Sequence, residues 1–160
     1  MTQRYAPGLF DRLIDEQITG RAGASTLTGT VTWTVEQLKE AIARDLESLL
    51  NTRAALSEQL LTGYPEASKS VLTYGLIDFA GMCMTSDVDR KRICAAVLLT
   101  IQRHESRLHS VTTALRMRSS QFNRFDLVIS GKLKAHAACD LVQFDAVLEP
   151  STQQYCIRKT

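Results

Sequence analysis

The sequence predicts an α+β domain, with helices packed on one face of a mostly antiparallel sheet of about four C-terminal strands. Up to His104, apolar residues recur every three or four positions, which is the period of a helix. From His109 onward they alternate with polar residues, which is the period of a half-buried strand. The strand-like runs follow one another through short links, and this favours an antiparallel meander.

Length and charge limit the classes of function. A chain of 160 residues suits one domain with a single core. Its 19 basic and 17 acidic residues are interleaved, so neither a nucleic acid nor an anionic membrane is indicated as a partner. No stretch approaches the roughly 20 consecutive apolar residues of a membrane span, and the polar start lacks a signal-peptide core. We therefore expect a cytoplasmic protein.

Residues 1–33 are expected to form a flexible N-terminal arm, and residues 34–160 a single α+β domain. The arm contains glycines separated by Ser and Thr. It includes four apolar residues on one face of a short amphipathic helix: Leu9, Phe10, Leu13 and Ile14. That helix either lies on its own domain or docks on a partner.

A long helix is predicted from Val35 to Leu50. Thr34 and Gln37 have the spacing of a capping box at its start. Its apolar residues keep steps of three or four and form one stripe: Val35, Leu38, Ile42, Leu46 and Leu49.

A short helix is predicted between Pro65 and Gly75, followed by a loop to Thr85. Ser86 is the predicted N-cap of a second long helix, with acidic residues in the first turn. That helix stops near His104. Its apolar face is formed by Ile93, Val97 and Ile101.

Three alternating runs predict half-buried strands: Val111 to Met117, Phe125 to Ala137 and Val142 to Leu148. A turn at residues 149–153 leads to a short fourth strand around Tyr155 and Ile157.

Known catalytic and metal motifs are missing from the sequence. There is no phosphate-cradling glycine loop, no nucleophile elbow and no metal-binding helix with paired histidines. The four cysteines have no close pair, which favours reduced thiols over a zinc site. His104 is expected to interact with the carbonyl groups and the dipole at the end of its helix.

Glu105 and Arg107 are the most notable charged pair. In an extended segment residues i and i+2 point to the same side, so the carboxylate and the guanidinium lie side by side. An exposed, solvated pair would contribute only about 0 to 1 kcal/mol. Otherwise the two either lock to each other or each hold a separate group across an interface. The spacing alone favours the exposed, solvated pair.

Four segments in order resemble the TssE family, the small baseplate wedge subunit of bacterial type VI secretion systems: residues 44–53, 70–81, 101–108 and 142–148. That family is similar to a phage baseplate wedge protein once labelled a tail lysozyme. Its signature is Glu-Pro-Arg, which here reads Glu105-Ser106-Arg107. Ser106 lacks the ring that fixes the backbone, and Ile77 stands where the family often has Pro. Both segments are therefore expected to be less rigid than in the family.

The resemblance implies a structural role without cofactor or metal. It implies that the chain joins TssF and TssG in a wedge and starts assembly of the contractile sheath, built from TssB and TssC. Contacts with TssK and the baseplate hub are compatible with it. The residues it implies for partner binding are Glu105, Arg107, Leu108, Asn51, Arg53, Tyr74 and Asp78. For the signature it favours the case in which Glu105 and Arg107 each hold a separate group, because an exposed mutual pair would contribute too little.

Two other functions compete with this one. The old family label suggests a peptidoglycan-cleaving enzyme with Glu105 as the acid, but no second carboxylate is recognisably placed for that task. A generic protein-interaction adaptor would keep the fold and lose the TssF and TssG partners.

Overall fold

The structure, a computed structural model, describes residues 5–6, 11, 33–56, 58–79, 81–83, 86–117, 125–134, 141–149 and 154–159. They belong to two compact units, residues 1–42 and residues 43–160. Helix α2 (Val35–Asn51) begins in the first unit and ends in the second. The amphipathic helix predicted at residues 9–14 falls almost wholly outside the described residues, so it stays a prediction, as does the arm at 1–33.

The described part of the first unit centres on the start of α2. The Tyr5 amide donates to the Trp33 carbonyl at 2.8 Å, and the Trp33 amide donates to the Tyr5 carbonyl at 2.6 Å. The Gln37 amide donates to Thr34 Oγ1 at 3.3 Å, and the Thr34 amide donates to Gln37 Oε1 at 2.9 Å. These reciprocal bonds are the predicted capping box, because each side chain satisfies an amide that the helix leaves unpaired.

Short helical turns lie between the two long helices. They are α3 (Glu58–Leu61), η1 (Ala67–Lys69) and η2 (Val71–Thr73). The sequence predicted a single helix between Pro65 and Gly75, and this was wrong. Ser70 is extended and divides the segment, and its hydroxyl accepts from the Leu72 amide at 3.3 Å to start η2. Helix α3 was not predicted.

Helix α4 (Asp87–His104) agrees with the prediction at both ends. The Ser86 hydroxyl accepts from the Asp89 amide at 3.4 Å, as expected of an N-cap residue. The predicted apolar face, Ile93, Val97 and Ile101, is buried.

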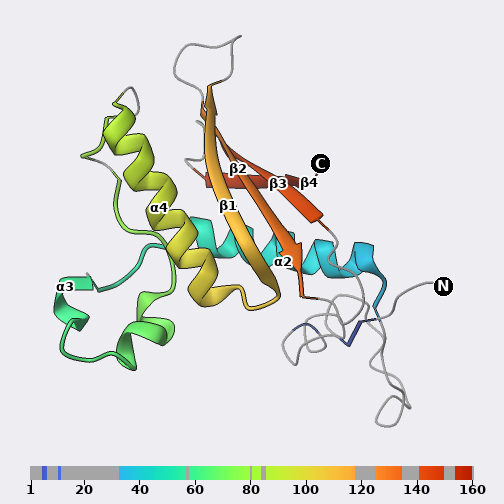
Figure 1. The fold of residues 1–160 in the computed structure, drawn as a ribbon, viewed down its shortest axis with the longest axis horizontal. Helices are drawn as coiled ribbons and strands as arrows, with labels where there is room; N and C mark the ends of the chain where they lie inside the picture. The colour runs from blue at the N-terminus through green and yellow to red at the C-terminus, as the bar shows by residue number, and fades with distance from the viewer. Residues whose placement is uncertain are drawn as a thin grey trace. The chain divides into compact units, whose positions relative to one another are not determined.

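Four strands form one antiparallel sheet: β1 (Leu108–Met117), β2 (Phe125–Leu133), β3 (Leu141–Glu149) and β4 (Gln154–Lys159). Their order in the sheet is β1-β2-β3-β4, which is the predicted meander. Figure 1 shows α4 beside β1, and the two helices pack against the sheet. The α+β fold is confirmed. Residues 135–137 of the second predicted strand lie outside the described residues.

A β-bulge near the start of β1 decides which residues of this strand face the core. The register between β1 and β2 shifts between His109 and Thr112, and Ser110 has a φ of 51°. The extra residue turns both Leu108 and Val111 inward, although they are three positions apart, and both are buried.

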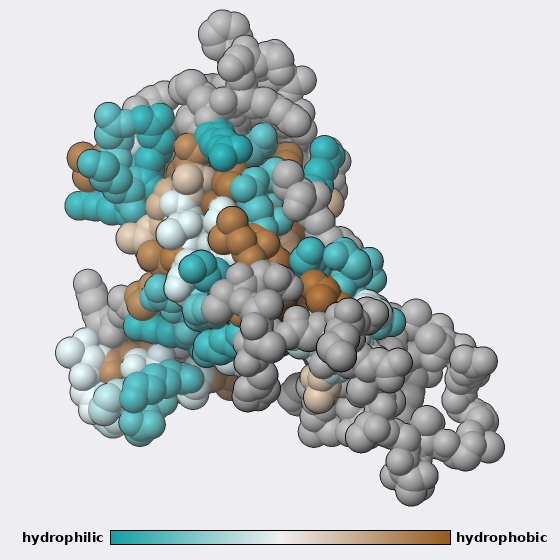
Figure 2. Space-filling model, turned by 45° about the vertical axis from the view of Figure 1, so that its right-hand side comes forward, coloured by the Kyte–Doolittle hydropathy of each residue, from teal (hydrophilic) through white to brown (hydrophobic). Residues whose placement is uncertain are grey.

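The core lies under one face of the sheet. Its strand residues alternate in register and are almost fully buried: Leu127, Ile129, Leu133, Val142, Phe144 and Ala146. The opposite face has half-buried polar residues around two buried valines, Val128 and Val147. In Figure 2, hydrophobic residues reach the surface between hydrophilic ones.

Candidate functional site

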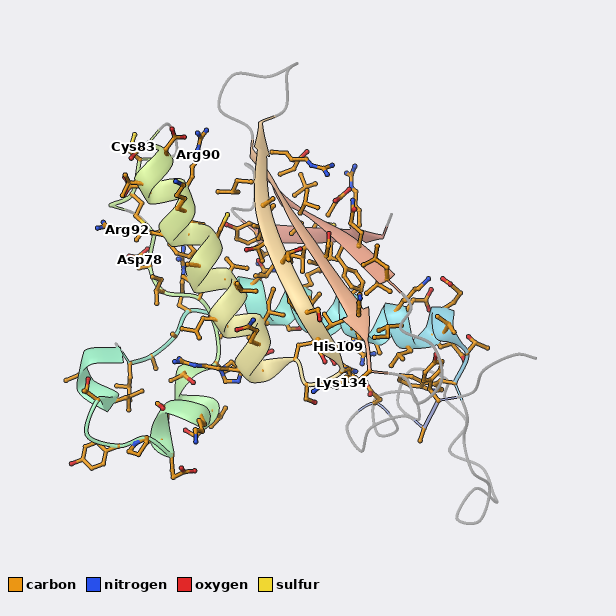
Figure 3. All side chains as sticks on the ribbon, in the orientation of Figure 1. Asp78, Cys83, Arg90, Arg92, His109 and Lys134 are labelled. Atoms are coloured by element: carbon orange, nitrogen blue, oxygen red, sulfur yellow. The ribbon has the colours of Figure 1, made fainter. Side chains whose placement is uncertain are left out.

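Three residues join helix α4 to strand β1: Glu105, Ser106 and Arg107. Glu105 is the C-cap, and its amide still donates to the Ile101 carbonyl at 2.8 Å. Two residues later the Lys134 amide donates to the Arg107 carbonyl at 2.9 Å, which anchors the end of β2 beside the joint. Figure 3 labels Lys134 and His109 at this end of the sheet.

Glu105 and Arg107 bind each other inside the molecule. Glu105 is only 4% exposed. Its Oε1 accepts from the Arg107 amide at 3.0 Å and from Nε at 2.8 Å, and its Oε2 accepts from Nη2 at 2.5 Å. The interpretation as a solvated pair is therefore wrong. The preference for two separate partner groups is not what the structure shows either. It shows the mutual lock, with the fork geometry in which a guanidinium binds a carboxylate best.

Asp45 of α2 is a third member of this group. Its Oδ2 accepts from Arg107 Nη2 at 2.5 Å. Burial alone would lower the pKa of Arg107, but hydrogen bonds and charges from Glu105 and Asp45 raise it above its ordinary value. The guanidinium is therefore a permanent cation between two carboxylates. We call Asp45, Glu105 and Arg107 the joint triad, because it links α2 to the α4–β1 joint.

Tyr74 lies near the joint triad and contacts His104. Burial, then the charges of Asp45 and Glu105, raise the pKa of Tyr74. The Tyr74 and His104 rings meet edge to face, with centroids 5.4 Å apart. His104 Nε2 lies 3.2 Å from the Thr73 hydroxyl and 3.1 Å from its carbonyl oxygen. The side chain of His104 thus holds the η2 segment against the end of α4, a contact that the helix-end interpretation did not include.

Asn51 and Glu47 of α2 bind the outer edge of β4. The Asn51 side chain donates from Nδ2 to the Tyr155 carbonyl at 2.9 Å and accepts the Tyr155 amide on Oδ1 at 2.7 Å. Glu47 Oε2 accepts the Ile157 amide at 3.1 Å. The helical spacing of four puts both side chains on one face, which is how both reach the same strand.

The segment after α2 pairs with the loop after η2. The Leu76 amide donates to the Thr52 carbonyl at 2.8 Å, and the Ala54 amide donates to the Leu76 carbonyl at 2.9 Å. On the surface, Arg53 lies 3.5 Å from Asp78, and their side chains are 68% and 73% exposed.

The structure brings together only some of the seven residues predicted for partner binding. Glu105 and Arg107 belong to the joint triad, and Tyr74 lies near it. Asn51 binds β4, and Arg53 and Asp78 form an exposed pair. Leu108 is buried in the core at 5% exposure. Sequence reasoning missed Asp45 and Glu47, although both lie in the segment 44–53 that carries the resemblance. The one sequence feature that could have indicated Glu47 is its spacing of four from Asn51, which puts both side chains on the same face of the helix.

Within the described residues no group of His, Cys, Asp and Glu could hold a metal ion. Cys83, Cys94 and Cys156 are free thiols. None of the described helices is long and apolar enough to span a bilayer.

Comparison with known protein families identifies the family of the chain. The family model of the baseplate wedge protein gp25 matches residues 36–138, which is more than half of the chain. The matched region contains α2 except its first residue, α4, β1, β2 and the whole joint triad. Searches of curated proteins and of solved structures find no significant match.

Proposed function

Because the chain belongs to the gp25 family of baseplate wedge proteins, we propose that it is the TssE-like wedge subunit of a type VI secretion system. In this role it joins TssF and TssG in the cytoplasm and provides the surface on which a sheath of TssB and TssC begins. The resemblance of four ordered segments to TssE supports this choice among contractile machines.

The joint triad is the observation that favours a structural role. The carboxylate at the position of the family signature is buried and bonded to Arg107, and Arg107 is bonded in turn to α2. Such a group holds two helices and a strand in one geometry. A subunit that must present a fixed surface to several partners needs this kind of internal bracing.

The same geometry weakens the lysozyme alternative. A general acid in glycoside hydrolysis must reach the leaving oxygen and carry a proton at working pH. Glu105 is buried and both of its carboxylate oxygens are bonded to Arg107, so neither oxygen is open to a leaving group. Asp45 binds the same guanidinium, which leaves no room for a sugar between the two carboxylates.

We place the contact with TssF and TssG on residues 58–79 and the neighbouring Arg53. Five of the eight large hydrophobic side chains exposed among the described residues lie in this segment: Leu60, Tyr64, Val71, Leu72 and Ile77. The Arg53–Asp78 pair lies beside Ile77, since Arg53 also donates to the Ile77 carbonyl at 3.4 Å. Exposed apolar side chains with polar neighbours are typical of a protein-binding surface. Glu105, Arg107, Leu108 and Tyr74 would act from behind this surface by fixing its position.

Co-expression with TssF and TssG tests the proposal. The wild type is expected to co-elute with both in size-exclusion chromatography, and Val71→Asp is expected to be lost from the complex because it puts a charge in the apolar contact. Leu141→Asp is the matched control, since Leu141 is 71% exposed and Val71 is 79% exposed, and it should still co-elute. A wild type that never co-elutes would favour the generic adaptor. Equal behaviour of the two variants would place the contact elsewhere.

A further inference from the structure

Helix α4 has a second apolar stripe, on the side opposite the face that it buries in the core. Val88, Ala95 and Leu99 are exposed, and their spacing of seven and four residues places them on one line along the helix. Val88 is 60% exposed and Leu99 is 38% exposed, so both belong to the large hydrophobic side chains exposed among the described residues. We call these three residues the outward stripe. A helix face that only meets water has polar side chains at such positions.

The neighbours of α4 within the second unit lie on either side of the outward stripe. On one side, the Thr113 hydroxyl of β1 donates to the Cys94 carbonyl at 2.9 Å. On the other side, the Thr100 hydroxyl donates to the Gly75 carbonyl at 3.5 Å. The helix is therefore already packed on three sides, and the outward stripe is on the fourth.

The charged residues beside the outward stripe are basic. Lys91, Arg92 and Arg103 are exposed, and each lies three or four positions from a residue of the stripe, which makes them its neighbours on the helix surface. Figure 3 shows Arg92 on the side of α4 that faces away from the sheet. The acidic residues of α4 are confined to its first turn, at Asp87 and Asp89. An apolar stripe with basic residues on both sides matches an apolar surface with acidic residues on both sides.

We propose that the outward stripe and its basic neighbours bind an amphipathic helix of another protein, with acidic residues flanking its apolar face. The stripe is about 16 Å long at 1.5 Å per residue, which suits a partner helix of about three turns. Ala95 lies in its middle and is small, so a second helix can approach closely there. Carboxylates on the partner then meet the basic neighbours and fix its orientation. This surface shares no residue with the contact that we place on residues 58–79.

Charge and composition favour this occupant over two others. A second copy of the chain would bring the same basic residues against the stripe, and like charges repel across an interface. A helix that lies on a membrane surface uses large anchors such as Trp, Phe and several Leu on its apolar face. The outward stripe has one valine, one alanine and one leucine, which fits the apolar face of a protein helix better.

A designed peptide is the probe for this site. It is an end-capped, fluorescent helix of about 18 residues, with leucines at steps of three and four and glutamates on both sides of them. Fluorescence anisotropy is expected to show saturable binding to the full chain. Lys91→Glu combined with Arg92→Glu should weaken binding at least about tenfold and should favour a peptide with lysines in place of the glutamates. Lys132→Glu combined with Lys134→Glu changes the net charge equally at two other exposed lysines and should keep the wild-type affinity.

The shape of the site is tested without a change of charge. Ala95→Trp fills the place of closest approach and is expected to weaken peptide binding at least about tenfold. Ala114→Trp, a change at an exposed alanine of β1, should bind the peptide like the wild type. Circular dichroism checks that each variant is folded. Wild-type affinity of a folded Ala95→Trp would overturn the site.

Other results would also overturn the proposal. A wild type that does not bind the glutamate peptide has no such site. Binding of the chain to phosphatidylserine vesicles but not to the peptide would assign the stripe to a membrane, and self-association that Ala95→Trp abolishes would assign it to a second copy. Val71→Asp is expected to bind the peptide normally, because Val71 belongs to the surface at residues 58–79, and loss of binding would assign the peptide to that surface instead.

Discussion

At the scale of single residues, the most informative group is Glu105. A buried carboxylate loses its hydration, and this cost is offset only when good hydrogen bonds replace the water. Arg107 provides three of them, and Asp45 shares the same guanidinium. Removing Glu105 would leave Arg107, whose side chain is only 27% exposed, without its main hydrogen-bond partner.

We predict that Glu105→Ala lowers the free energy of unfolding by about 3–5 kcal/mol, as for other broken buried ion pairs. For a chain of this size that corresponds to a melting temperature about 6–20 °C lower. Glu66→Ala is the matched control, because Glu66 pairs with Lys69 on the surface, where an ion pair contributes at most about 1 kcal/mol. Thermal unfolding followed by circular dichroism measures both. Equal melting temperatures of the two variants would contradict the structural role of the joint triad.

At the scale of elements, the C-terminal half of α2 connects the parts of the second unit. Asp45 reaches the α4–β1 joint, and Glu47 and Asn51 reach β4. The segment directly after the helix pairs with Leu76. This one stretch of helix thus contacts the segment that leads into one edge strand, β1, and the other edge strand, β4.

Gly75 allows the last of these contacts. It has a φ of 110°, and a Cβ atom at this position would lie 2.6 Å from the Thr52 carbonyl oxygen. A positive φ costs an L-residue about 1–2 kcal/mol, and the collision with the main chain adds to it. We therefore predict that Gly75→Ala destabilises the fold by about 2 kcal/mol or more, or about 4–8 °C in melting temperature. Gly63→Ala meets nothing within 4 Å and should change stability by less than about 1 kcal/mol.

The sequence predicted the elements well and the contacts between them poorly. The stripe from Val35 to Leu49 and the alternation after Val111 are local patterns, so α2 and the meander could be read directly. The Asp45–Arg107 and Glu47–Ile157 contacts join residues 62 and 110 positions apart, and no local period records such a distance. For the same reason the spacing of Glu105 and Arg107 showed that they are neighbours but not that they are buried.

At the scale of the whole molecule, the chain is a braced α+β subunit of the baseplate wedge family. Its second unit has exposed apolar side chains at residues 58–79. The edge of its sheet at β4 is bonded to the side chains of Asn51 and Glu47. Exposed apolar side chains of this kind suit contact with other baseplate components.

The need for this chain in sheath assembly is tested most directly by counting extended sheaths in cells that carry fluorescent TssB and lack this chain. We predict no sheaths without the chain and normal numbers once the wild type is supplied from a plasmid. We also predict wild-type numbers with Leu141→Asp and few or none with Val71→Asp. Sheaths in normal numbers without the chain would contradict a role as a structural baseplate component that sheath assembly needs.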